Sequence, residues 1–226
     1  QIRSSAASDV YKRQALRLWL EQLNYPVHPA RVARFRVPDD TDILFILEPT
    51  STVSRDEWRQ LDRWVENGGV LIIAGERFAA SPAFRHYQFA LVYLNSSPPN
   101  QLQTAMETPL WRSPIMAPAE IRAQAYLQSR REDFVTHIST NGKPVIVSFQ
   151  KGSGRVILSA VTYPFTNAGL RDSGNAALVL NIVSTANRPK GIWFDEWHHG
   201  IREIDREIVG PVNWLLASPI GHALLY

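Results

Sequence analysis

The residues best suited to chemistry form one short segment near the end of the chain, from Asp195 to His199. The segment reads Asp-Glu-Trp-His-His and combines two carboxylates with two imidazoles. Such groups suit a divalent cation, or general acid–base catalysis in which neighbouring charges tune each other's pKa. In an extended segment, alternate side chains share a face. We therefore expect Asp195 to share a face with His199, and Glu196 with His198.

The same spacing argues against a zinc site. His198 and His199 are neighbours and would point to opposite faces, so they would not bind one metal together. The sequence also has no cysteine and no histidine pair at helical spacing. It therefore predicts no metal ligands and no cofactor. A purely structural interpretation has both carboxylates bonding backbone amides and arginines, while the histidines pack on Trp193 or Trp197.

Other polar residues follow the segments that we expect to be strands. Because ligands bind beyond the carboxyl ends of parallel strands, these residues could converge on one rim of a sheet. Turn formation and helix capping also explain residues such as Asn167 and Asn175. The candidate ligand-binding rim comprises Glu48, Glu76, Arg77, Thr166, Asn167, Asn175, Asp195, Glu196, His198 and His199.

The elements that must position this rim begin with a strand–helix–strand unit. Residues 43–47 and 70–74 are continuous apolar runs, as expected of strands buried on both faces. Between them, Ser54 and Glu57 have the spacing of a capping box, and Asn-Gly-Gly at 67–69 predicts the end of the helix. The short connections indicate a right-handed parallel crossover.

The pattern weakens over residues 78–142, which we interpret as an inserted irregular or β subregion. A strand is expected at 89–94, and five prolines then precede a charged helix or turn around 128–133. Beyond it, residues 144–149 and 155–161 predict a hairpin. A helix capped by Asp172 or Ser173 follows, and then a last strand at 191–194.

Composition limits the classes of function. The 226 residues with 45% apolar content suit one domain, and a net charge of +3 is too small to indicate nucleic-acid binding. The absence of cysteine excludes disulfides, thiolate ligands and cysteine nucleophiles. The sequence also lacks a Gly-x-Ser-x-Gly motif, so it predicts neither common nucleophile.

Both ends lead to expectations about the native protein. Residues 1–14 look like a translated linker from a metagenomic reading frame and are set aside. Residues 15–200 are expected to form the single α/β domain. Residues 201–226 are expected to be a helix that leads into a truncated transmembrane segment, because 212–226 are almost uncharged and include Trp214.

Several blocks together resemble the DUF4350 family over residues 15–226. They are Ala15–Val27, Asp42–Pro49, Trp64–Val70, Gly152–Val156, Thr166–Leu170, Asn175–Leu178 and Phe194–Gly200. The Asp-Glu-x-His-His-Gly stretch is the most distinctive of them. The sequence departs from the family at Asn24, where a glycine is common, and upstream of the first helix.

The resemblance implies a three-layer α/β domain, flavodoxin-like or similar to class I glutamine amidotransferases, with a mostly parallel sheet and helices on both faces. It places the domain between two membrane helices of a bacterial or archaeal protein, often encoded beside a MoxR-type ATPase. It implies no catalytic residues. In an amidotransferase-like fold the nucleophilic cysteine would fall near Glu76, where this chain has a glutamate.

Three functions are consistent with these observations. We expect a membrane-tethered, non-enzymatic binding or interaction domain of an envelope or transport-associated complex, on the extracytoplasmic side. One alternative is a metal-assisted hydrolase that uses Asp195, Glu196 and His198, with Glu48, Glu76 or Asn167 lining the site. The other alternative is a sensor of small molecules or glycans that uses the same rim without chemistry.

Overall fold

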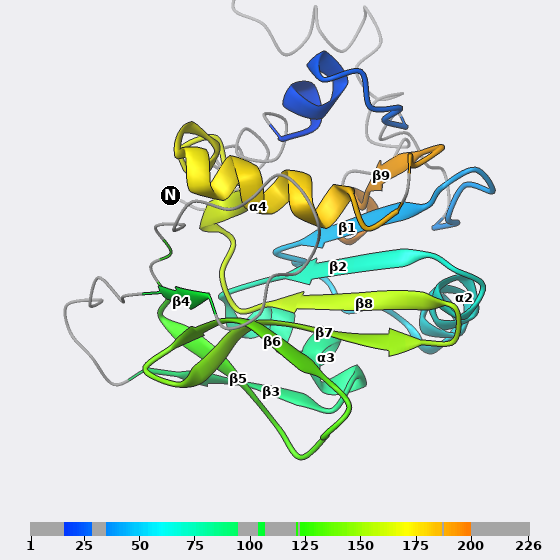
Figure 1. Ribbon diagram of the computed structural model, residues 1–226. Helices are drawn as coiled ribbons and strands as arrows, with labels where there is room; N and C mark the ends of the chain where they lie inside the picture. Colours follow the sequence, from blue (N-terminus) through cyan, green and yellow to red (C-terminus); the bar gives the residue numbers. More distant parts are fainter. Residues whose placement is uncertain are drawn as a thin grey trace, which may run out of the picture.

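A mixed β-sheet forms the centre of the protein. The computed structural model describes residues 16–28, 35–94, 104–106, 121, 123–186 and 188–199. In this part of the chain, seven strands pair in the order β4-β6-β7-β8-β2-β1-β9 (Figure 1). Their bounds are β1 (Ile43–Leu47), β2 (Val70–Ala74), β4 (Thr104–Met106), β6 (Val135–Thr140), β7 (Lys143–Lys151), β8 (Gly154–Ser159) and β9 (Ile192–Phe194).

The sheet has a parallel half and an antiparallel half. Strands β8, β2, β1 and β9 are parallel neighbours, whereas β4, β6 and β7 pair antiparallel. The expectation of a mixed α/β fold is confirmed, but the sheet is less parallel than expected. The reason is that tight turns join β6 to β7 and β7 to β8, and such turns can only join antiparallel strands.

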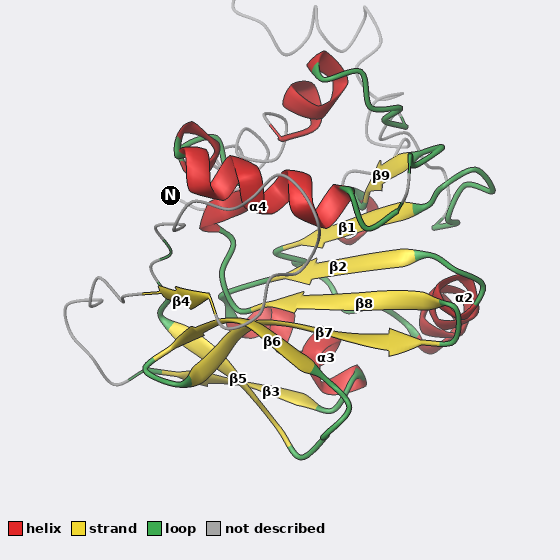
Figure 2. Ribbon diagram, in the orientation of Figure 1, coloured by secondary structure: helices red, strands yellow, loops and turns green. Residues whose placement is uncertain are grey.

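Two crossovers run in opposite directions across the parallel half. Helix α2 (Arg55–Glu66) connects β1 to β2, and helix α4 (Ser173–Val183) connects β8 back to β9. Because parallel crossovers are right-handed, connections that run in opposite directions place their helices on opposite faces. Figures 1 and 2 show α4 and α2 on the two sides of the sheet accordingly.

Local sequence explains where α2 begins and ends. The Ser54 hydroxyl accepts from the Glu57 amide, and the Glu57 carboxylate accepts from the Ser54 amide at 2.7 Å, so the expected capping box is confirmed. Asn67 caps the other end, and Gly68 follows with φ +112°. The Trp64 indole donates to the Thr41 carbonyl at 3.0 Å, which ties α2 to the start of β1.

The 78–142 region extends the sheet and adds a second one. Helix α3 (Ser81–His86) leads into β3 (Phe89–Tyr93), which pairs antiparallel with β5 (Ala125–Ser129) in a small sheet that packs against β7. The expected strand at 89–94 is thereby confirmed. Residues 128–133 contain the end of β5 and a bend, so the turn expected there as one alternative is closer to the structure than the helix.

The core lies around β1, β2 and β8. Every residue of β1 and β2 is buried, as their apolar runs predict. Near the start of the chain, Val27 makes a single parallel bridge to Ile192. Among the described residues, none of the helices is long and apolar enough to span a bilayer. The predictions for residues 1–14 and 201–226 fall outside the described residues.

Candidate functional site

The parallel half of the sheet brings polar residues together at its carboxyl edge. Register pairs Leu47 of β1 with Ala74 of β2, and Ala74 with Ser159 of β8, so these strands end level with one another. Glu48 directly follows β1, and Glu76 lies two residues beyond β2. On the other side of β1, Asp195 follows β9 and donates its amide to the Phe45 carbonyl at 2.9 Å.

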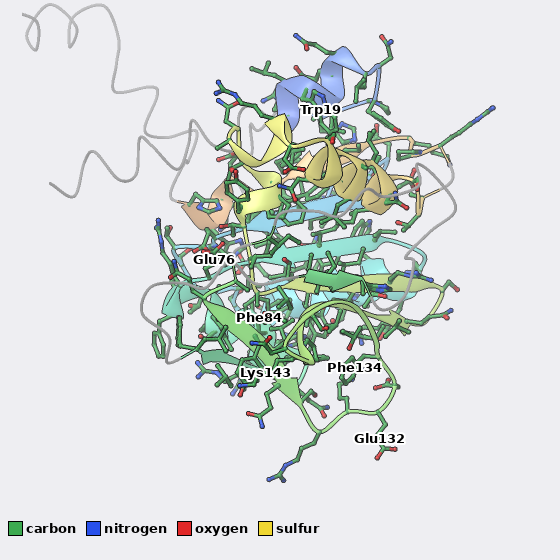
Figure 3. The ribbon with its side chains drawn as sticks, turned by 60° about the vertical axis from the view of Figure 1, so that its left-hand side comes forward. Trp19, Glu76, Phe84, Glu132, Phe134 and Lys143 are labelled. Atoms are coloured by element: carbon green, nitrogen blue, oxygen red, sulfur yellow. The ribbon has the colours of Figure 1, made fainter. Side chains whose placement is uncertain are left out.

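A glutamate network joins the loops that follow three of these strands. The Glu48 carboxylate accepts from the amide of Glu76. The Glu76 carboxylate in turn accepts from the amide of Thr162 at 2.6 Å and from its hydroxyl at 2.9 Å. Glu76 lies at this edge in Figure 3. We call Glu48, Glu76 and Thr162, with their bonds, the glutamate network.

Glu48 is an unusual residue for this position. Its φ of +49° is in the left-handed region, which is strained for a non-glycine residue. Burial raises the pKa of its carboxyl group, and the charge of Glu76 adds to this. The amide of Glu76 and the guanidinium of Arg77 oppose the rise, without reversing it; Arg77 Nε lies 4.0 Å from Glu48 Oε2.

A second cluster centres on the buried imidazole of His198. Its Nδ1 lies 2.6 Å from Asp195 Oδ2, and its Nε2 lies 3.4 Å from Glu57 Oε2. We call Asp195, His198 and Glu57 the His198 clamp. It joins the segment after β9 to the first turn of α2. The His198 and Asp195 side chains are 2% and 0% exposed, so solvent does not reach this pair.

The pairing expected from an extended segment is wrong. Asp195 pairs with His198, because Trp197–His199 form a 3₁₀ turn. Residues three apart lie on the same side of such a turn. The Asp195 carboxylate also accepts from the amide of Trp197 at 3.1 Å and from that of His198 at 3.3 Å.

The His198 carbonyl holds a third segment. It accepts from the amides of Thr50 and Ser51, each at 3.0 Å. It also accepts from the hydroxyls of the same two residues, at 2.9 and 3.1 Å. The loop between β1 and α2 is thus bound to the backbone of the segment after β9. These hydroxyls bond the carbonyl group of His198 and not its ring.

The clamp shifts the pKa values of two members. Burial works to lower the pKa of His198, but its hydrogen bonds and the charges of Asp195 and Glu57 outweigh burial and raise it above the usual value. Burial works to raise the pKa of Glu57, but hydrogen bonds from Ser54 and the charge of His198 outweigh this effect and lower it. Both shifts favour an imidazolium between carboxylates.

The remaining residues of the predicted rim lie in local turns or nearby. Thr166 bonds within its own turn, to the Tyr163 carbonyl at 2.8 Å and the Gly169 amide at 3.1 Å, and Asn167 is exposed in that turn. Asn175 is fully buried in the first turn of α4 and donates to the Gly169 carbonyl at 3.2 Å. Glu196 and His199 are half-buried beside the clamp.

Two participating residues were not predicted as site residues. Glu57 was predicted only as a capping residue, and its contact with His198 spans 141 positions. Thr162 binds Glu76 across 86 positions, whereas the sequence suggested Thr166 and Asn167 for that place. Thr162 is the first polar residue after the run at 155–161 that was expected to be a strand, and this position was the signal that could have identified it. Within the described residues, no group of three histidine, aspartate or glutamate side chains has the geometry to hold a metal ion.

The fold and this edge define an α/β domain built on a mixed sheet, with a polar rim at its carboxyl end. Comparison with protein families identifies it further. The chain belongs to the DUF4350 family, a domain of unknown function, whose profile matches residues 14–183. The resemblance of the sequence to this family is thereby confirmed over those residues, whereas the Phe194–Gly200 block lies beyond the matched range. No curated protein matches the chain.

Several solved structures are distantly similar to the chain. The mmIFT52 N-terminal domain is 15% identical with a TM-score of 0.47, over 64% of this chain and 76% of that domain. A β-galactosidase from Rahnella sp. R3 is 12% identical with a TM-score of 0.45, over 66% of this chain and 23% of that one. The β-galactosidase from Bacillus circulans sp. alkalophilus is 14% identical with a TM-score of 0.42, again over 66% and 23%. The chain thus spans about a quarter of either galactosidase.

Proposed function

We propose that this chain is a binding domain that recognises a ligand or partner without catalysing a reaction on it. One observation carries the proposal: the acid–base groups of the carboxyl edge bond one another and the backbone. Both ring nitrogens of His198 face carboxylates, those of Asp195 and Glu57. Both oxygens of Asp195 are also engaged: Oδ1 accepts from the amides of Trp197 and His198, and Oδ2 faces the His198 ring.

The chemistry of nucleophilic catalysis explains why this matters. A serine or threonine nucleophile is activated when its hydroxyl donates to an imidazole nitrogen. The hydroxyls of Thr50 and Ser51 donate to the carbonyl of His198 instead. A buried imidazolium between two carboxylates is suited to joining chain segments, because each removed partner would leave an unpaired buried charge.

Hydrolysis of chromogenic substrates tests the proposal. The wild type would be incubated with p-nitrophenyl acetate, p-nitrophenyl phosphate and a set of p-nitrophenyl glycosides, beside His198→Gln and Glu57→Gln. His199→Gln is the matched control, since it removes the neighbouring imidazole. We expect no turnover that depends on His198.

Turnover by the wild type and His199→Gln that is lost in His198→Gln would overturn the proposal. Because His198→Gln could unfold, circular dichroism would be recorded at the assay temperature. Glu57→Gln provides the second comparison, since it leaves the imidazole and its contact with Asp195 in place.

We further propose that the domain is tethered to a membrane, on the extracytoplasmic side, in an envelope or transport-associated complex with a MoxR-type ATPase system. The support is the uncharged stretch at 212–226 and the family resemblance. The full-length gene would be expressed in bacteria, and membranes would be extracted with alkaline carbonate. Retention in the membrane, with the domain cleaved by protease added outside the cell, is the expected result; release by carbonate would contradict it.

We also propose the finer fold assignment, a three-layer flavodoxin-like or amidotransferase-like domain over residues 15–200 with an insertion at 78–142. Its support is the run of parallel neighbours β8-β2-β1-β9 with crossover helices on opposite faces. A chain in which 107–120, between β4 and β5, is replaced by a short glycine-serine linker tests the insertion while keeping every described strand. Retained cooperative unfolding is expected, and an unfolded product would contradict it.

A further inference from the structure

Exposed aromatic side chains flank the glutamate network at the carboxyl edge. Phe78 is 73% exposed and directly follows Arg77, the partner of Glu48. Tyr163 is 36% exposed and directly follows Thr162, the partner of Glu76. Phe78 is therefore two residues from Glu76 in the chain, and Tyr163 is one residue from Thr162.

A third aromatic ring comes from the small sheet. Tyr93 ends β3 and is 46% exposed. Partial burial raises the pKa of Tyr93, and the negative charge of Glu48 adds to this effect. Three separate segments thus carry exposed aromatic residues: two follow the partners of Glu48 and Glu76 directly in the chain, and the third is influenced by the charge of Glu48. We call Phe78, Tyr93 and Tyr163 the aromatic edge.

The other large exposed apolar residues of the described chain differ in type and place. They are Leu18 and Leu23 near the first helix, and Val135 at the start of β6. All three are aliphatic. Rigid aromatic rings provide contact area at low cost in side-chain entropy and are common in binding sites. Their concentration at the carboxyl edge favours a binding role over chance exposure.

The charged groups at this edge balance each other. The Arg77 guanidinium is 56% exposed, and its Nε lies 4.0 Å from a Glu48 oxygen. A cationic ligand would be repelled by Arg77, and an anionic ligand by Glu48 and Glu76. For a neutral polar ligand, the Arg77 guanidinium provides N–H donors and the carboxylates provide acceptors.

We propose that the aromatic edge binds a neutral saccharide, with a pyranose ring stacked on an aromatic side chain and its hydroxyls bonded to Arg77 and Glu48. A pyranose has an apolar C–H face and a rim of hydroxyl groups. The electron-rich face of an aromatic ring attracts polarised C–H groups, and hydroxyls satisfy donors and acceptors together. This inference rests on the proposed function, since it names the ligand class of the same edge.

Calorimetric titration with cellotetraose, maltotetraose and chitotetraose at millimolar concentration tests the inference. We expect at least one of them to bind, and Phe78→Ala and Arg77→Gln each to weaken that binding about tenfold, as expected for the loss of one good contact. Leu18→Ala is the matched control, because it removes an exposed apolar side chain outside the edge. It should leave the affinity unchanged.

Three outcomes would overturn the saccharide assignment: no binding by any of these oligomers, equal weakening by Leu18→Ala, or binding that Phe78→Ala does not change. Chromatography of the oligomer after incubation separates the two proposals. An intact oligomer supports both, whereas cleavage would retain the saccharide assignment and overturn the non-enzymatic function.

Discussion

His198 joins three chain segments through two different groups. Its ring bonds Asp195 and Glu57, and its carbonyl bonds Thr50 in the loop between β1 and α2. Only the ring contribution depends on pH. A folded-state pKa above the usual value means that the imidazolium stabilises the fold at low pH. This stabilisation is complete below about pH 6.5 and is lost as pH rises through the raised pKa.

The first prediction concerns that pH dependence. His198→Gln should lower the free energy of unfolding by about 3 kcal/mol near pH 6, since it breaks a buried charge pair. The difference from the wild type should shrink as pH rises from 6.5 to 9, because the wild type loses the imidazolium contribution. Urea denaturation at steps of half a pH unit measures both quantities. A constant difference across this range would contradict the clamp, and His199→Gln provides the control curve.

The second prediction concerns Glu48. Burial raises the pKa of Glu48, whereas burial opposes the raised pKa of His198. Burial penalises the charged form of Glu48, so the folded state holds the proton more tightly than the unfolded state. Its ionisation therefore lowers wild-type stability as pH rises from about 4.5 through the raised pKa. Glu48→Gln should remove that decrease, which denaturation between pH 4.5 and 7 measures. If the stability of Glu48→Gln fell with pH in parallel with that of the wild type, the prediction would be wrong. Glu21→Gln is the surface control.

The residues of the edge could be predicted only in part from sequence. Glu48, Glu76 and Asp195 follow apolar runs, and the rule for parallel strands is enough to place them. The partner of His198 could not be predicted, because it depends on whether the backbone at 197–199 is extended or turned. Nothing in the amino-acid order of that short segment distinguishes the two conformations.

Among the elements, α2 and the β7–β8 hairpin depend on close backbone contact. The Ser153 amide donates to the Glu66 carbonyl at 2.9 Å, at the end of α2. A Cβ atom added at Gly154 would overlap the Val65 and Gly69 carbonyl oxygens. Glycine is therefore required at 154 by packing, and its own backbone angle is not the reason.

The third prediction compares Gly154, at the start of β8, with Gly142 in the turn between β6 and β7. Gly154→Ala should lower the free energy of unfolding by about 3 kcal/mol, because backbone atoms must move to admit the methyl group. Gly142→Ala has open space around its Cβ but a φ of +70°, and should cost only about 1 kcal/mol. Urea denaturation of both variants measures the difference. Equal losses would show that the hairpin can move away from α2.

Element prediction succeeded where the signal was local. The capping box at Ser54 and the apolar run of β1 specify their structures through contacts within a few residues. The pairing of β3 with β5 was not predicted, since the two strands are separated by the proline-rich segment. The antiparallel half of the sheet depends on such distant pairings, and strand period alone does not specify them.

For the whole molecule, the burial of the strands predicts the order in which they unfold locally. Strands β1, β2 and β8 lie in the middle of the core, whereas β3 has half-exposed and exposed residues and only one described partner, β5. As the fourth prediction, amide hydrogens of β1 and β2 should exchange only by global unfolding, and those of β3 at least about tenfold faster. Exchange measured by mass spectrometry checks this. Equal protection would indicate that the small sheet unfolds with the core.

The position of β9 beside β1 affects how the chain folds during synthesis. β1 is made early, yet its neighbour on one side begins at Ile192, and Val27 also bridges to that residue. Until the ribosome has released this part of the chain, one side of β1 stays an open apolar edge, available to other nascent chains. The large sequence separation also implies slow folding. Expression of this domain should therefore depend strongly on chaperones that cover exposed strands before translation ends.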